Sequence, residues 1–592
     1  MSKRSGALVS FGRAVALVSA AGRGVFLATV TLFAISGLGM VALLLVGSSL
    51  LHELSHGAQA ASSMRVWWLL IAAVGVAGIV SFANAAAAGM HRLLAEQTVR
   101  YCNEVMLGAA TNASLREFDS AEFHDRLQRA RNNSGSALQV AMAVPQVIAA
   151  VVSAAGVTVG LAVVSPWLVP ITLLSCVPLW LVGRGNSEEM YSFSFGNTPQ
   201  DRARFHIERI VLDRRSAAEV RAFRLAAFMR ERWSRLYDER IQEIRTLVRR
   251  FVRRSAVGAG IGSLMLCAVL VLVLILVRHG EMPVEAAATA CVAILMLANR
   301  SQAAVSNLAQ MMEQQLYVEE FIELRALERQ LLPQSTIPIA PFRELVVDNV
   351  SFRYSAADTN AVDGVNVSIS AGEVIAIVGQ NGSGKTTLAK LLSGLYEPSD
   401  GQIRWDGTPL SQLTTDGGLS EAGVVFQDFA RYWFSAADNI AVGDVDRADD
   451  HAAIAAAAHD ADATGFIERL PNGFDTPLGV EVDGGADISG GQWQRIAIAR
   501  VLFRNASFII LDEPTAALDA EAEAALFDTI QDLRAGRTIV LISHRFSTVR
   551  TADRILVLHE GRLVEEGSHA ELMARDGRYA KMYGLQSRAY VG

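Results

Sequence analysis

Long runs without a charged side chain are the feature of this sequence that most restricts its fold. Four of them lie in the first half of the chain: Val25 to Leu51, Val66 to Met90, Asn132 to Gly183 and Ser255 to Val277. A helix rises about 1.5 Å per residue, so about 20 apolar residues cross a hydrocarbon layer of about 30 Å. Buried helices of a soluble protein are shorter and carry a polar face. The runs therefore predict membrane-spanning helices.

Six spans are expected in total. The third run is long enough for two of them, and Ser165-Pro166-Trp167 supplies the turn between these two spans. The sixth begins near Pro283 and extends towards Gln310, with Arg300 as its only charge after Glu285. A charge in such a span either lines a cavity or reaches the headgroups or an acidic partner, and both interpretations of Arg300 stay open.

The arginines predict the orientation of the spans. They are abundant in the long connections at 92–131 and 184–254, whereas the opposite loops carry only Arg65 and Arg278. Because cytoplasmic loops are enriched in Lys and Arg, both termini and both long connections are expected in the cytoplasm of a plasma (inner) membrane protein. Residues 1–23, with four basic side chains, predict an amphipathic helix at the cytoplasmic surface rather than a signal peptide.

A change of composition divides the chain of 592 residues. Pro333, Pro338 and Pro341 break the last helix, and short apolar strands then alternate with helices in an α/β pattern. The predicted domains are therefore 1–332 with the six spans, a linker at 333–341, and 342–592. The net charge of −7 and the lack of a basic tail argue against nucleic acid as a partner.

One stretch of the second domain has the G-x-x-x-x-G-K-T spacing of a phosphate loop: Gly379-Gln380-Asn381-Gly382-Ser383-Gly384-Lys385-Thr386-Thr387. An apolar strand precedes it and a helix follows it, as such a loop requires. Glycines let the backbone N–H groups curl round an anion. Lys385 is expected to reach the β- and γ-phosphates of a nucleotide, and Thr386 to ligate Mg²⁺.

Two further motifs belong to the same chemistry. An apolar strand at 508–511 ends in Asp512 and Glu513, and we expect Asp512 to hold Mg²⁺ and Glu513 to polarise a water for attack on the γ-phosphate. Ile488-Ser489-Gly490-Gly491-Gln492 opens a helix about 100 residues past the phosphate loop and predicts a second anion site. Two such sites serve one nucleotide if two chains sandwich it.

In this order the motifs resemble those of ATP-binding-cassette (ABC) transporters, in the half-transporter form with the membrane domain first, and the resemblance covers essentially the whole chain. It implies that residues 488–492 are the signature motif, with Ile488 in place of the usual Leu. It also implies four roles: Gln427 senses Mg²⁺ and the γ-phosphate, His544 contacts the γ-phosphate, Asp519 belongs to the D-loop, and Tyr354 stacks on adenine.

The resemblance further implies contacts between domains and between chains. Gly479 to Gly485 resembles the loop that touches the partner's cytoplasmic helices, and segments near Ser120–Arg129 and Ser216–Phe223 resemble the two coupling helices. The implied partner is a second half-transporter. A homodimer is favoured because the phosphate loop and the signature are both intact, and a heterodimer is possible.

The implied fold is a six-helix, all-α transmembrane domain of the exporter type followed by an α/β P-loop nucleotide-binding domain. The implied activity is hydrolysis of ATP with Mg²⁺. Alternating access would couple it to export of a small amphipathic molecule, a lipid or a peptide across the bilayer.

Three other functions are compatible with parts of this sequence. The spans exclude a soluble cassette ATPase that acts on nucleic acid or ribosomes. A channel on this fold would carry a damaged catalytic set, whereas Glu513, His544 and the signature are intact. An importer on the exporter fold, for example for a metal chelate or a siderophore-like solute, stays open. No peptidase domain is expected before the first span, because few residues precede it and Cys102 is the first cysteine.

Overall fold

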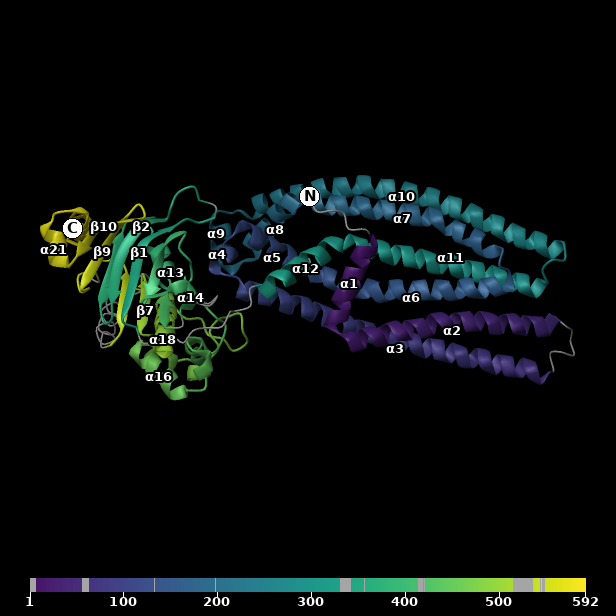
Figure 1. Cartoon of the computed structure of the whole chain (residues 1–592), viewed down its shortest axis with the longest axis horizontal. Coiled ribbons are helices and arrows are strands. Elements are labelled where there is room, and N and C mark those ends of the chain that lie inside the picture. The colour runs from purple at the N-terminus through teal and green to yellow at the C-terminus, as the bar shows by residue number, and fades with distance from the viewer. Residues whose placement is uncertain are drawn as a thin grey trace. The chain divides into compact units, whose positions relative to one another are not determined.

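The structure, a computed structural model, describes residues 7–55, 63–132, 134–196, 198–330, 342–355, 357–413, 419, 421–514, 536–543, 545 and 549–591. The chain forms two compact units (Figure 1). The first comprises Met1–Gly108 and Arg126–Leu327, and the second comprises Ala109–Asp125 and Glu328–Gly592. A short segment of the first long connection thus belongs to the second unit. The linker predicted at 333–341 lies outside the described residues, so the domain boundaries stay predictions.

The first unit is helical. Its helices are α1 (Ala7–Ala21), α2 (Arg23–Ser55), α3 (Met64–Asn112), α5 (Ala121–Asn132), α6 (Ser134–Val164), α7 (Leu168–Gly196), α8 (Thr198–Leu212), α9 (Arg214–Ala222), α10 (Ala226–Arg278), α11 (Val284–Glu313) and α12 (Gln315–Gln330), of which α3, α5 and α12 extend into the second unit. Figure 1 shows the long helices running side by side. α11 packs against α6, α7 and α2, and Ile294 and Leu297 on its inner face are buried.

Five described helices are long and apolar enough to cross a membrane, namely α2, α3, α6, α10 and α11. They coincide with the first, second, third, fifth and sixth predicted spans. α7 covers the predicted fourth span and is not among the five. α10 has 53 residues, a length of about 80 Å against a hydrocarbon layer of about 30 Å. The protein is therefore a multi-pass membrane protein, and its longest helix extends well beyond the bilayer.

The N-terminal segment forms the helix that was predicted, but protein covers its apolar face. Ala14, Leu17 and Val18 of α1 are buried, and α1 packs against α6 and α2. Leu94 of α3 belongs to the same buried cluster. The apolar face of this helix is therefore satisfied largely inside the first unit rather than by lipid.

The second unit contains two sheets. The antiparallel sheet has the order β2-β1-β4-β5, from β1 (Glu344–Phe352), β2 (Val362–Ser370), β4 (Asp400–Trp405) and β5 (Thr408–Pro409). The larger sheet has the order β10-β9-β3-β8-β7-β6, from β3 (Val374–Gly379), β6 (Ala422–Val425), β7 (Phe508–Asp512), β8 (Thr538–Ile542), β9 (Arg554–His559) and β10 (Arg562–Gly567). All its neighbours pair in parallel except β9 and β10. The predicted fold class is thus confirmed: a helical membrane domain precedes an α/β domain.

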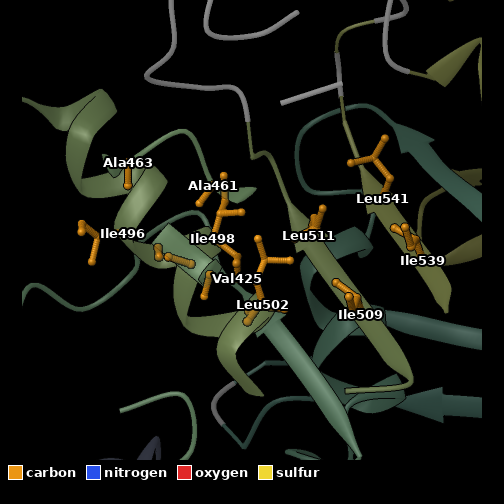
Figure 2. Packing of buried hydrophobic residues seen from close by; sticks show 14 of the residues in the cluster. Val425, Ala461, Ala463, Ile496, Ile498, Leu502, Ile509, Leu511, Ile539 and Leu541 are labelled. Carbon is orange, nitrogen blue, oxygen red and sulfur yellow. The ribbon is translucent and has the colours of Figure 1, made fainter. Parts of the chain in front are cut away.

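The larger sheet is buried on both faces because successive side chains of a strand point to opposite sides. In β3, Ile375 and Ile377 pack with the antiparallel sheet and α13 (Lys385–Leu392). Ala376 and Val378 belong to the core on the other face. Figure 2 shows that core, in which Ile498 and Leu502 of α18 (Gly490–Arg504) lie towards the side chains of Ile509 and Leu511, whereas Ile496 lies beside Ala463. This double burial holds the ends of the parallel strands in fixed positions.

Short helices complete the second unit. They are α4 (Leu115–Phe118), α14 (Leu410–Leu413), α15 (Ala436–Ala441), α16 (His451–Asp460), α17 (Thr464–Ile467), α21 (His569–Ala574) and α22 (Arg578–Val591). The Glu565 carboxylate caps the N-terminus of α22. It accepts hydrogen bonds from the backbone N–H groups of Arg578 and Tyr579, the latter at 2.9 Å. A side chain from β10 thus satisfies donors that a helix N-terminus leaves without a partner.

Candidate functional site

The phosphate-loop sequence connects β3 to α13, and two of its glycines are required by close contacts. A Cβ on Gly379 would lie 2.4 Å from Ser383 Oγ and 2.5 Å from the Leu558 carbonyl oxygen. Gly384, at φ +98°, is the N-cap of α13, and a Cβ there would lie 2.3 Å from the Ala361 carbonyl oxygen. The loop can therefore curl tightly only because these positions lack a side chain.

Lys385 lies inside this loop and is buried. Its Nζ donates hydrogen bonds to the carbonyl oxygens of Gly379, at 2.9 Å, and Gln380, at 3.1 Å. Burial lowers the pKa of Lys385, and the nearby carboxylates of Glu513 and Asp512 act in the opposite direction. The amine is thus held where the loop curls, with the two acids as its nearest charged neighbours.

Asp512 ends β7 and is only 2% exposed. Burial raises the pKa of Asp512, whereas a hydrogen bond from Thr386 and the charge of Lys385 lower it. Two buried oxygens, Asp512 Oδ2 and Ser383 Oγ, have no hydrogen-bond partner among the described residues. An orphaned buried acceptor costs about 1–3 kcal/mol. A small divalent cation with oxygen ligands would satisfy such atoms, so the residues present fit Mg²⁺.

Glu513 and Gln427, which lie 86 positions apart, meet here: Gln427 Nε2 donates to Glu513 Oε2 at 2.9 Å. Glu513 has φ +51°, in the left-handed region that is unfavourable for a residue with a Cβ. Its backbone N–H donates to the Ile542 carbonyl at 2.9 Å, and the Gln494 side chain donates to the next carbonyl, that of Pro514. These bonds hold a strained residue at the end of β7, a feature that often marks functional sites.

Tyr354 lies beside α13 and is half-buried. Its hydroxyl lies 3.1 Å from Thr387 Oγ1. Its ring stands perpendicular to the rings of Phe352 and Tyr396, with centroid distances of 5.1 and 5.8 Å. The predicted adenine contact therefore lies beside the phosphate loop, within an aromatic cluster that the sequence did not reveal.

The signature segment forms the N-terminus of α18. Ser489 Oγ accepts a hydrogen bond from the Gln492 N–H at 3.3 Å, and Gln492 Oε1 accepts one from the Ser489 N–H at 2.9 Å. Ile488 anchors the segment in the core, and Ser489 is exposed. This reciprocal cap fixes the helix start and leaves the N–H groups of Gly490 and Gly491 near a positive helix end.

The loop Gly479–Gly485 lies against an exposed aromatic side chain. A Cβ on Gly479 would lie 2.8 Å from Trp433 Cδ1, and Trp433 is 56% exposed. The prediction that this loop touches a partner chain is not tested by the single chain. Asp519 and His544, the remaining predicted site residues, lie outside the described residues.

The segment Ala109–Asp125 belongs to the second unit and contacts other parts of that unit at Leu115 and Asp119. Leu115 packs against the core that contains Phe352, and Tyr396 Oη donates a hydrogen bond to Asp119. The sequence placed the first coupling helix near Ser120–Arg129, and these contacts lie N-terminal to it. Asp119 and Tyr396 are 277 positions apart, so no local pattern could have paired them.

Comparisons with known proteins agree with this geometry. Residues 362–516 match the family model described as ABC transporter. An ATP-dependent lipid A-core flippase of Alkalilimnicola ehrlichii is 45% identical over 250 residues, which is 42% of this chain and 42% of that protein. The subtilin transport ATP-binding protein SpaT of Bacillus subtilis is 28% identical over 486 residues, covering 81% of this chain and 78% of that protein.

A solved structure of a bacterial Atm1-family ABC exporter with ATP bound has the same fold. Its TM-score is 0.78 at 24% identity, and the match covers 96% of this chain and 99% of that one. The flippase match, in contrast, spans only about two fifths of that relative's length. The match to the family model lies within the second unit, while the fold likeness extends over nearly the whole chain.

Proposed function

We propose that this chain is an ATP-driven transporter of the ABC family, of the exporter type, with its membrane domain before its nucleotide-binding domain, as the family match and the fold likeness suggest. One observation carries the proposal. Lys385 begins the helix that follows β3, Asp512 and Glu513 lie at the end of β7, and Gln427 follows β6; these four side chains meet at one place. Parallel sheets bind ligands at the carboxyl ends of their strands, and this set suits a nucleoside triphosphate.

The proposed roles follow from the geometry. The N–H groups of the phosphate loop and Lys385 bind the β- and γ-phosphates of ATP. Thr386, Asp512 and Gln427 hold Mg²⁺, which neutralises phosphate charge when bound. Glu513 accepts a hydrogen bond from Gln427, and this bond orients its carboxylate to polarise a water. His544 contacts the γ-phosphate, and Asp519 belongs to the D-loop.

The second half of each nucleotide site comes from a partner in this proposal. The start of α18, residues 488–492 with Ser489 exposed, binds the γ-phosphate of ATP held by a second copy, which favours a homodimer. The exposed Trp433 beside Gly479 supports a role of the Gly479–Gly485 loop as a contact surface. The domain boundaries 1–332, 333–341 and 342–592 and the cytoplasmic position of both termini belong to the same proposal.

The cargo is proposed at the level of chemical class. One similar protein is named a lipid A-core flippase and another a subtilin transport protein. An amphipathic lipid or peptide is thus the class that the relatives support. ATP closes two nucleotide-binding domains, and this closure shifts the population of the membrane domain towards its outward-open state.

Glu513→Gln tests the proposal. The amide keeps the shape of the carboxylate but polarises water less well, so we expect ATP turnover of the reconstituted protein to fall at least about 100-fold while ATP still binds. Glu468→Gln, an exposed change at the end of α17, is the matched control. Near-normal turnover of Glu513→Gln would remove this residue from the catalytic role.

A further inference from the structure

Three aromatic rings, Phe352, Tyr354 and Tyr396, form a cluster beside the phosphate loop that we call the aromatic triad. Phe352 and Tyr396 are stacked, with centroids 4.7 Å apart and an interplanar angle of 27°. Tyr354 stands at 88° to both rings. Two perpendicular contacts and the hydroxyl contact with Thr387 leave the Tyr354 ring little freedom to rotate. The triad therefore fixes the orientation of the proposed adenine contact.

The segment Ala109–Asp125 contacts two of these three rings. The Tyr396 hydroxyl donates a hydrogen bond to the Asp119 carboxylate. The Arg116 guanidinium lies 5.9 Å from the centroid of the Phe352 ring. A reciprocal cap between Ser114 and Glu117 holds α4, which ends at Phe118 and has Asp119 as its C-cap. Asp119 is thus presented to Tyr396 by a fixed turn rather than by a loose chain.

Tyr396 is buried and contacts Asp119, Tyr354 and α13 at the same time. It is 2% exposed, and Lys390 Nζ lies 5.1 Å from its ring centroid, on α13. Burial, and after it the hydrogen bond with Asp119, raise the pKa of Tyr396, so the phenol stays protonated and donates. A hydrogen bond to a carboxylate is stronger than one between neutral groups. A displacement of Asp119 therefore acts on the Tyr396 ring, which contacts Tyr354 and α13.

We propose that Tyr396 is a positioning residue that links Tyr354 to the segment Ala109–Asp125, so that binding of the adenine base and docking of this segment strengthen each other. The inference rests on the proposed function, since it needs ATP at the phosphate loop. Coupling between two sites is reciprocal. If base binding orders the triad and tightens the Asp119 contact, the contact must in turn raise the affinity for ATP.

Three variants of the full-length protein in lipid nanodiscs test the link: Tyr396→Phe, Asp119→Ala and the double variant. Tyr396→Phe keeps the ring and removes only the donor. We expect each single variant to raise the KM for ATP about fivefold, equivalent to about 1 kcal/mol, with kcat within about twofold of the wild type. The KM of the double variant for ATP should be no higher than that of either single variant, because both substitutions remove the same hydrogen bond. Glu397→Gln, an exposed acid next to Tyr396, is the matched control.

Inorganic tripolyphosphate separates this link from a general loss of structure. It has the phosphates but no base, so its inhibition constant should be the same in the variants and the wild type. An unchanged KM for ATP, multiplicative effects in the double variant, or an equal loss of tripolyphosphate affinity would each overturn the link. A wild-type protein without ATPase activity would instead overturn the proposed function, so the two failures are distinguishable.

Discussion

Gly384→Ala is the substitution whose effect the structure defines most directly. Gly384 begins α13 at φ +98°, and an added Cβ would lie 2.3 Å from the Ala361 carbonyl oxygen. A carbon and a carbonyl oxygen approach no closer than about 3.3 Å, so the backbone must move by about 1 Å. Because Ala361 precedes β2 and Gly384 precedes Lys385, the movement displaces the phosphate loop from the sheet.

Two effects add at this position. The left-handed conformation costs an alanine about 1–2 kcal/mol, which lowers the free energy of unfolding of the nucleotide-binding domain. A misplacement of about 1 Å in a binding group costs about 100-fold in rate. We therefore expect a fall in ATP turnover of about two orders of magnitude, larger than the loss of stability alone explains.

The assay pairs ATP turnover with thermal unfolding of the same purified protein. Gly407→Ala is the matched control, because Gly407 has φ +82° and an added Cβ would meet nothing within 4 Å. The control should lose stability by about 1 kcal/mol and keep its KM for ATP. Wild-type turnover in Gly384→Ala, or an equal loss of turnover in both variants, would refute the steric reasoning.

Three further predictions concern stability, pH and assembly. Glu565→Ala removes the carboxylate that accepts from the Arg578 and Tyr579 N–H groups; it should cost about 1 kcal/mol in thermal unfolding and leave ATP turnover unchanged, and an unaltered melting temperature would contradict this cap. The Ala453 N–H and the Arg447 side chain hold the pKa of Asp450 below its usual range, so the stabilisation is present above the unfolded pKa of about 3.9 and is lost as pH falls through the lower folded value. As the pH falls below about 4, Asp450→Asn should therefore lose less stability than the wild type. An identical dependence of stability on pH in the two proteins would contradict this role of Asp450. The purified chain alone should hydrolyse ATP with a rate that rises steeply as dimers form, whereas a monomer inactive at every concentration would exclude the homodimer.

The sequence by itself determined those features that depend on local patterns. The absence of charge over Val25–Leu51 or Ser255–Val277 predicts a span because lipid cannot solvate a charge or an open backbone group. The spacing of Gly379, Gly384 and Lys385 between a strand and a helix predicts the phosphate loop for a similar reason, since it needs only neighbouring residues. These features agree with the helices and strands of the structure.

Only the tertiary structure decided which distant residues meet. Gln427 and Glu513 form a hydrogen bond because β6 and β7 are neighbours in the sheet, a pairing that no local pattern encodes. The left-handed backbone of Glu513 could likewise not be predicted, because the sequence has no glycine at this position. Asp119 and Tyr396 meet because the segment Ala109–Asp125 folds into the same compact unit as Tyr396. Local periodicity reports how a residue is buried, but the partner that buries it is chosen by the packing of whole elements.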